Sequence, residues 1–215
     1  FTSGSTGLPK GVALSHGALN HFVRAAGVRY GLRAEMRVLQ FAPFNFDASI
    51  EEVFTTLSHG ATLVLRNDAM LESMSAFAQQ VEQWQIQLLD LPTAFWNEWV
   101  VALQAEHSWI PDCVQAVIIG GEAIYPDPLT CWQRIAPSSV RLINTYGPTE
   151  ATVVVTSCEL QAWPTSDGAL PIGRLLPGMQ GLILAQGDRP ALEGELVLAG
   201  PHLASGYLGG VSGGF

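Results

Sequence analysis

The first eleven residues combine glycines, hydroxyl side chains and one ammonium group. They read FTSGSTGLPKG, and Lys10 is the only lysine of the whole chain. Glycines let the backbone turn so that N–H groups approach an anion, and the hydroxyls and the lysine add further donors. This chemistry suits phosphate, although the GxxxxGK[ST] spacing of the P-loop is absent. A flexible linker is the alternative, but Pro9-Lys10-Gly11 runs into an apolar, strand-like segment, which argues against it.

A second polar segment, Asn144-Thr145-Tyr146-Gly147-Pro148-Thr149-Glu150, follows directly after an apolar run. In open α/β sheets, ligands collect just beyond the carboxyl ends of the strands. Thr149 could donate to a phosphate there, and Glu150 is a candidate Mg²⁺ ligand beside phosphate oxygens. The alternative is a turn that carries a surface glutamate.

Two further segments are less specific when taken alone. Gly120-Gly121-Glu122-Ala123 also follows an apolar run, and its small residues would let a flat ring lie against the backbone, or would simply form a tight turn. The segment GELVLAGPHLASGYL, at 194–208, indicates a strand, a turn and a loop.

These segments need a scaffold, and the pattern up to about residue 150 supplies one. Apolar runs that indicate strands alternate with apolar residues at helical spacing, which favours a layered α/β architecture. We expect strands at 38–42, 61–65, 88–91, 114–119 and 140–144, and helices at 48–58, 74–84, 94–104 and 127–135. In the first helix, the apolar stripe consists of Ile50, Val53, Phe54 and Leu57.

The character of the chain changes near Pro164. Gly and Pro become frequent, and short apolar strands are expected at 181–185 and 195–198 without helices between them. We therefore expect an α/β core over 1–163 and a small β-rich subdomain over 164–215. Both ends look cut, because the chain opens on a loop motif and stops in a Gly-rich stretch, so we expect an internal fragment.

Composition excludes several classes of partner. The net charge of −9 argues against a nucleic-acid surface. No stretch approaches the roughly 18–20 apolar residues that span a bilayer, and no signal peptide is visible, so no membrane partner is expected. Cys113, Cys131 and Cys158 fit neither zinc-ligand spacing nor a disulfide framework, which indicates reduced cysteines and a cytoplasmic location. The five histidines show neither metal-ligand nor triad spacing.

The segments together, in this order, resemble the adenylate-forming superfamily, which comprises acyl-CoA synthetases, luciferases and the adenylation domains of nonribosomal peptide synthetases. The strings that carry the resemblance are FTSGSTGLPKGV, FNFDASIEEVF, GGEA, NTYGPTEATV and GELVLAGPHLASGYL. They span essentially the whole chain, and the FDAS and NTYGPTE forms resemble the peptide-synthetase branch. The resemblance implies the layered α/β core of the large N-terminal part of such an enzyme, with the C-terminal lid subdomain absent.

The resemblance also implies the chemistry and its residues. A carboxylate attacks the α-phosphorus of ATP, pyrophosphate leaves, and the acyl-adenylate is passed to the phosphopantetheine thiol of a peptidyl carrier protein. Lys10, Thr149 and Glu150 would be catalytic, with Glu150 binding Mg²⁺. The nucleotide would be held by Thr2, Ser3, Gly4, Ser5, Thr6, Gly7, Lys10, Gly121, Glu122, Ala123, Asn144, Tyr146, Gly147 and Thr149.

The amino-acid pocket follows from the same resemblance. Asp47 would pair with the substrate α-ammonium, although it could also cap the following helix. The pocket would be lined by Asp47, Ala48, Glu51, Asp90, Ile118, Gly120, Thr145, Val153 and Val154. Glu51 borders the apolar stripe whereas Glu52 is expected to point elsewhere. Because carboxylates in a closed cavity need a counter-charge, we predict a basic amino acid, lysine or ornithine first. The alternative is that one carboxylate is solvated or paired with an arginine.

Two other functions stay open at this stage. A carboxylic acid:CoA ligase of the same superfamily would need no partner for an α-ammonium, so Asp47 separates the two. A nucleotide-binding module without turnover is the second alternative. Since the expected ribose-binding Asp and the lid with its catalytic lysine are missing, we expect the 215-residue chain alone to be inactive.

Overall fold

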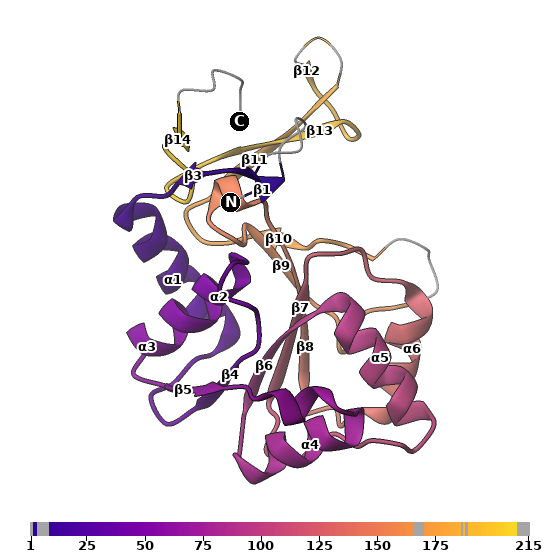
Figure 1. The fold of residues 1–215 in the computed structure, drawn as a ribbon. Helices are drawn as coiled ribbons and strands as arrows, with labels where there is room; N and C mark the ends of the chain where they lie inside the picture. Colours follow the sequence, from indigo (N-terminus) through magenta and orange to yellow (C-terminus); the bar gives the residue numbers. More distant parts are fainter. Residues whose placement is uncertain (1, 4–8, 166–169, 186, 188, 210–215) are drawn as a thin grey trace.

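The computed structural model describes residues 2–3, 9–165, 170–185, 187 and 189–209, and its centre is a seven-stranded sheet (Figure 1). The strand order is β10-β9-β8-β7-β6-β4-β5. Five strands run parallel: β4 (Arg37–Gln40), β5 (Thr62–Leu65), β6 (Leu88–Pro92), β7 (Ala116–Gly120) and β8 (Arg141–Tyr146). At one edge β9 (Thr156–Glu159) and β10 (Arg174–Leu175) continue the sheet in antiparallel fashion. The structure is therefore mixed α/β with a mostly parallel sheet, as predicted.

Three helices cover one face of this sheet: α4 (Met74–Gln83), α5 (Thr93–Gln104) and α6 (Pro126–Ile135) (Figure 1). A 3₁₀ turn, η2 (Asp68–Leu71), precedes α4. Trp96, Trp99 and Trp132 are fully buried beneath them, and the ring of Trp132 lies 5.9 Å from that of Trp96 and 5.7 Å from that of Trp99. Because such large aromatic side chains bury much apolar area, they dominate this core.

The opposite face is covered by α1 (His16–Tyr30) and by a second helix made of three consecutive pieces (Figure 1). These pieces are α2 (Ala48–Ile50), the π-helical η1 (Glu51–Thr55) and α3 (Thr56–Ser58). Sequence analysis did not predict α1, although its signals are present. Ser15 accepts a hydrogen bond from the N–H of Ala18 at 3.0 Å, and Gly31 ends the helix in the left-handed conformation with φ 71°.

The second helix has the predicted bounds, but its buried face differs from the one expected, since of the apolar stripe only Ile50 packs against the core. Phe54 and Leu57 of the apolar stripe are 44% and 57% exposed, whereas Glu51, Glu52 and Thr55 are buried. Within a π-helical turn, successive side chains are spaced differently from those in an α-helix, so both glutamates face inward. The polar face of this helix therefore turns toward the sheet.

The remaining strands gather at one end of the molecule (Figure 1). They form a small sheet of β11 (Gln180–Ala185), β12 (Arg189–Pro190) and β13 (Glu195–Ala199), and two pairs, β1 (Thr2–Ser3) with β2 (Pro9–Lys10) and β3 (Val12–Ala13) with β14 (Gly206–Tyr207). The other predicted strands and helices are confirmed, with ends within two residues of the predictions. In the described part of the chain no helix is long and apolar enough to cross a membrane.

Candidate functional site

A cavity of about 460 Å³ opens at the carboxyl ends of the central parallel strands. This is where ligands bind in sheets of this kind. The loop after β4 and the start of the following helix form one wall, and the ends of β6, β7 and β8 together with the segment before β9 form the rest. Its described lining is Ala42, Pro43, Phe46, Asp47, Ala48, Glu51, Glu52, Asp90, Leu91, Pro92, Gly120, Gly121, Glu122, Thr145, Tyr146, Gly147, Val153 and Val154.

One end of the cavity is buried and acidic. Glu51 and Glu52 are 3% and 2% exposed, and Asp47 and Asp90 share this end with them. Among the described lining residues there is no Lys, Arg or His. The cavity therefore brings acidic groups together in a place where water would screen their charges poorly.

Glu51 is held by a residue of α1. The buried hydroxyl of Tyr30 donates a hydrogen bond to its Oε1. Burial raises the pKa of Glu51 to about 8; the hydrogen bond from Tyr30 opposes that rise, and the charges of Glu52 and Asp47 add to it. At neutral pH a nearby cation would therefore favour the ionised form.

Glu52 also lines the cavity, contrary to the prediction that it points elsewhere. Its Oε1 accepts from the backbone N–H groups of Phe41 and Ala42, each at 2.9 Å, and its Oε2 accepts from Gln40 Nε2 at 3.0 Å. Burial raises its pKa to about 7, while these hydrogen bonds and Arg66 lower it. Since its oxygens already have donors, Glu52 fixes the end of β4 and the loop that leads to Asp47.

The carboxyl group of Asp90 differs from that of Glu52 in its hydrogen bonding. Its Oδ2 is buried, and no hydrogen-bond partner for this atom exists among the described residues. Burial, followed by the charges of Glu51 and Glu52, raises the pKa of Asp90 well above its ordinary range. A buried oxygen without a partner is costly, so this atom marks a place where a ligand donor would stabilise the site.

The other end of the cavity is wider and carries glycines and an aromatic ring. Gly121 has φ +85°, and a Cβ added there would meet nothing within 4 Å, so its backbone borders open space. Tyr146 is 42% exposed beside it. At Gly120, by contrast, a Cβ would lie 2.6 Å from Thr145 Oγ1, so a larger residue would displace that hydroxyl. The flat, side-chain-free surface at Gly121 fits an aromatic ring.

A strained segment forms part of the cavity wall. Thr152 and Val153 have φ 55° and 67°, which is unfavourable for side chains branched at Cβ. The conformation is stabilised by the close approach of Gly147, where a Cβ would lie 2.4 Å from the carbonyl oxygen of Val153. The N–H of Val155 also donates to the carbonyl of Tyr146 at 2.9 Å. This packing places Val153 and Val154 against the cavity.

Lys10, Thr149 and Glu150, predicted to act on the nucleotide, do not line the cavity: Tyr207 contacts Lys10 and Glu150, and Asp47 contacts Thr149. Thr149 donates to Asp47 Oδ2, and Tyr207 donates to Glu150 Oε1 at 2.6 Å. The ammonium of Lys10 lies 5.3 Å from the centre of the Tyr207 ring, within the range of a cation–π contact.

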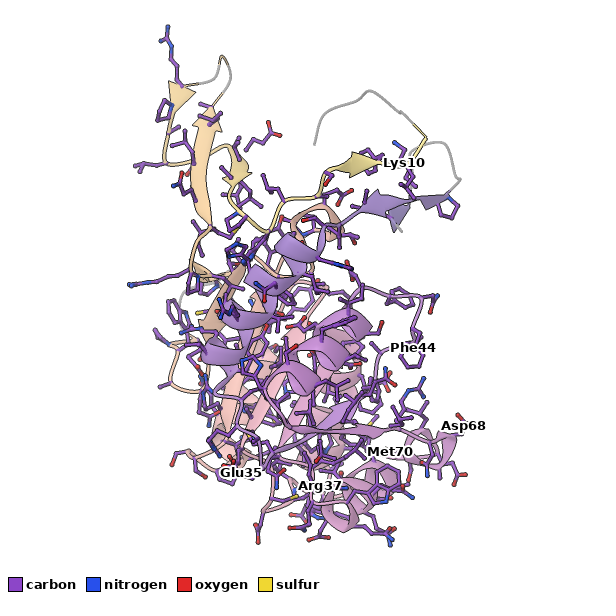
Figure 2. The ribbon with its side chains drawn as sticks, turned by 90° about the vertical axis from the view of Figure 1, so that its left-hand side faces the viewer. Lys10, Glu35, Arg37, Phe44, Asp68 and Met70 are labelled. Atoms are coloured by element: carbon purple, nitrogen blue, oxygen red, sulfur yellow. The ribbon has the colours of Figure 1, made fainter. Side chains whose placement is uncertain are left out.

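These contacts lie at the carboxyl ends of the parallel strands. Figure 2 shows Lys10 next to β14, at the end of the molecule opposite Arg37, where β4 begins. The N–H of Ala204 donates to the carbonyl of Glu150 at 2.7 Å, and that of Leu208 donates to the carbonyl of Gly11 at 2.8 Å. Residues 204–208 therefore connect two parts of the site: the segment that follows the Gly-rich loop, and the loop that carries Glu150.

The comparisons with known proteins agree with this arrangement. A model of the family described as AMP-binding enzyme matches residues 1–208. The chain belongs to this family. The adenylate-forming membership predicted from the motifs is confirmed.

Relatives of this chain include synthetases of which it matches only a small part. Isonitrile lipopeptide synthase of Streptomyces coeruleorubidus is 48% identical over 97% of this chain, and the match spans 14% of that protein. Nonribosomal peptide synthetase 32 of Fusarium pseudograminearum is 35% identical, also over 97% of the chain, but over 2% of that protein. A solved structure with a similar fold is the NpsA N-terminal subdomain of Klebsiella oxytoca in complex with 3-hydroxybenzoyl-AMSN. It has 26% identity and a TM-score of 0.79, and the match covers 96% of this chain and 52% of that one.

The structure brings together most, but not all, of the predicted site residues. Eight of the nine predicted pocket residues line the cavity; Ile118 instead lies in the core between the sheet and α1. Gly121, Glu122, Tyr146 and Gly147 line the wide end, whereas Ala123 and Asn144 do not, and Asn144 Nδ2 donates to the carbonyl of Pro171 at 2.9 Å. Thr2 and Ser3 lie in β1, paired with β2, and Gly4, Ser5, Thr6 and Gly7 lie outside the described residues.

Glu150 is the residue that would hold a metal ion bound to the nucleotide. The described residues contain no group of three or more His, Cys, Asp or Glu arranged to hold one. Mg²⁺ commonly binds through one or two carboxylates together with substrate phosphates, so the single carboxylate of Glu150 fits an ion carried by a nucleotide. Such an ion would neutralise phosphate charge.

Proposed function

We propose that this chain is the ATP- and substrate-binding part of an adenylation domain that activates a basic α-amino acid, lysine or ornithine first. The observation that carries the proposal is the acidic end of the cavity: four carboxylates, no basic lining residue among those described, and a buried oxygen of Asp90 without a partner. The relatives among peptide synthetases support the general class.

The charge balance favours a cation over a neutral or acidic side chain. Several buried carboxylates cannot all ionise together without a counter-charge, and burial and mutual repulsion raise the pKa values of Glu51 and Asp90. A distal ammonium between Glu51 and Asp90 would pair with both. A carboxylate side chain would add to the repulsion, and an apolar one would leave the oxygen of Asp90 unsatisfied.

Asp47 would receive the α-ammonium of the same substrate at the mouth of the acidic end. The substrate carboxylate would then point toward Thr149, because Thr149 and Asp47 are in hydrogen-bond contact. In the proposed reaction, a carboxylate oxygen forms a bond to the α-phosphorus of ATP while the bond to pyrophosphate breaks. Lys10 and Glu150 with its Mg²⁺ would stabilise the charge on the phosphates.

The rest of the proposal concerns parts beyond these residues. The aminoacyl-adenylate would pass to the phosphopantetheine thiol of a carrier protein, with AMP as leaving group, in the cytoplasm. The division into 1–163 and 164–215 stays a prediction, and β10 already adds a strand from the second part to the large sheet.

The test is amino-acid-dependent pyrophosphate exchange by the intact domain, including the sequence that flanks these residues in its parent protein. The panel contains lysine, ornithine, norleucine, leucine and glutamate, together with 6-aminohexanoate, which lacks the α-amino group. Preference for lysine or ornithine supports the proposal, and preference for leucine or glutamate overturns it. Formation of an acyl-CoA from 6-aminohexanoate as the preferred reaction would instead indicate a CoA ligase.

A further inference from the structure

We propose that Tyr30 of α1 is a positioning residue for side-chain selection: its hydroxyl holds the Glu51 carboxylate as an acceptor that faces the cavity. The inference deepens the proposed function and rests on it. Tyr30 is not among the described residues that line the cavity, so it would act on the substrate only through Glu51.

The backbone geometry of α1 makes this contact possible. Gly27 lies one turn before Tyr30 and faces the end of the second helix, where a Cβ would lie 2.0 Å from His59 Cε1. The ring of His59 is itself held, because its Nδ1 lies 2.8 Å from the carbonyl oxygen of Thr55. The absence of a side chain at Gly27 therefore lets α1 approach the π-helical turn, and α1 lies alongside this helix in Figure 1.

Tyr30 is fixed on its other side as well. Arg141 Nη1 donates to the carbonyl oxygen of Tyr30 at 2.7 Å, and Tyr30 is only 2% exposed. Burial, and next the charge of Glu51, raises the pKa of Tyr30 well above its ordinary range, so its hydroxyl stays protonated. A hydroxyl that cannot ionise and cannot reach water has one role here, which is to donate to Glu51.

The two neighbouring glutamates consequently have different tasks. Glu52 accepts four hydrogen bonds from Gln40 and from the backbone of Phe41 and Ala42, which leaves it little capacity for a ligand. Glu51 accepts one at Oε1, from Tyr30, and lines the cavity opposite Asp90. Glu51 and Asp90 are thus the acidic groups free to bind a distal ammonium, and Tyr30 controls the orientation and ionisation of the first.

The ionisation of Glu51 depends on every charged or titratable group that faces it. These are Tyr30 from α1, Asp47 and Glu52 from its own segment, and Asp90 from β6. The three carboxylates disfavour its negative charge, and the Tyr30 hydroxyl favours it. Removing that hydroxyl should therefore make Glu51 harder to ionise, and the binding of a cationic substrate should then require a higher pH.

The experiment compares Tyr30→Phe with the unchanged domain in pyrophosphate exchange between pH 6 and 9. We expect the KM for lysine to rise about tenfold, in keeping with loss of a hydrogen bond to a charged group, while the KM for ATP stays within twofold. The acid limb of the kcat/KM profile for lysine should move to higher pH by about one unit, and the profile for norleucine should not move. Tyr125→Phe, on an exposed tyrosine, is the control.

A double-mutant cycle with Glu51→Gln separates positioning from a general packing effect. In the Glu51→Gln background, Tyr30→Phe should change neither the lysine KM nor the profile. Equal effects in both backgrounds, or an unchanged lysine profile in folded Tyr30→Phe, would overturn the inference. If Tyr30→Phe does not fold, a second measurement takes its place. Calorimetry of lysine binding to the unchanged domain, in two buffers at pH 7.5, measures the release of protons. Binding of lysine without proton release contradicts the inference. Rejection of basic substrates by the unchanged domain would instead defeat the proposed function itself.

Discussion

The hydroxyl of Thr149 donates a hydrogen bond to the carboxylate of Asp47, across 102 positions of the sequence. Thr149 belongs to the segment expected to contact the α-phosphate of ATP, and Asp47 belongs to the segment expected to hold the α-ammonium of the amino acid. The hydrogen bond therefore joins the residue proposed to contact the nucleotide to the residue proposed to hold the amino acid.

The first prediction concerns Asp47 itself. Asp47→Asn keeps a side chain that accepts from Thr149 but removes the negative charge. We expect kcat/KM for the preferred α-amino acid to fall at least about 100-fold, since an unpaired ammonium is left in a poorly solvated site. Pyrophosphate exchange measures this. Equal losses for 6-aminohexanoate, which has no α-ammonium, would argue against the role of Asp47.

The second prediction is a coupling between the two ligands. Thr149 has one proton to donate, so a nucleotide that accepts this hydrogen bond takes it away from Asp47. Asp47 should then bind the α-ammonium more tightly. We expect a non-hydrolysable ATP analogue to tighten amino-acid binding at least about fivefold, a typical coupling between sites. Calorimetry should show that Thr149→Ala abolishes this coupling and Thr149→Ser keeps it; an unchanged coupling in Thr149→Ala would refute the link.

The third prediction concerns Tyr207, which contacts both Lys10 and Glu150. Tyr207→Phe retains the ring near the ammonium of Lys10 but removes the hydrogen bond to Glu150 Oε1. We expect the KM for MgATP to change by several-fold and the amino-acid KM to stay the same. Steady-state kinetics over a range of Mg²⁺ concentrations measure this, with Tyr125→Phe as control. A change confined to the amino-acid KM would show that the contact serves another purpose.

The fourth prediction is a loss of stability with rising pH. The pKa of Glu51 is about 8 in the folded chain and about 4.3 in an unfolded one, so the folded state keeps a proton that the unfolded state releases. The contribution of Glu51 to the free energy of unfolding must therefore fall as the pH rises from about 4.3 to about 8.

Thermal unfolding of the intact domain at pH 6 and pH 8 tests this. At pH 8, Glu51→Gln should unfold at a temperature at least about 2–4 °C higher than the unchanged domain, which corresponds to about 1 kcal/mol. The unfolding temperature of Glu51→Gln should also fall less between pH 6 and pH 8 than that of the unchanged domain. Glu98→Gln, on an exposed residue of α5, is the control. Equal declines in all three proteins would disprove the assignment.

The scaffold could be predicted from the sequence to a large extent. Apolar runs bounded by glycine and proline predicted the strands from 38 to 144, because central parallel strands are buried on both faces and contain few polar residues. The location of the cavity also followed, since the motifs come directly after those strands. The Asp90 carboxylate was conspicuous because it interrupts such an apolar run.

The site escaped prediction where a side chain contacts an element distant in sequence. No spacing rule connects Tyr30 with Glu51, or Tyr207 with Glu150, because these contacts depend on how packed elements meet. The apolar stripe of residues 48–58 predicted the wrong buried face, since it assumed an α-helical period through a π-helical turn. For α1, the cap at Ser15 and the glycine at 31 were available signals that were not used.

The close approach of α1 at Gly27 has a consequence for redesign. Exchanging cavity-lining side chains is the obvious route to a new substrate, yet a new residue at position 51 would still meet the Tyr30 hydroxyl. A branched apolar side chain there would leave that hydroxyl without its acceptor, and α1 already packs at Gly27 against His59, at the end of the helix that contains position 51. A successful exchange of specificity in this scaffold would have to transplant α1 along with the cavity.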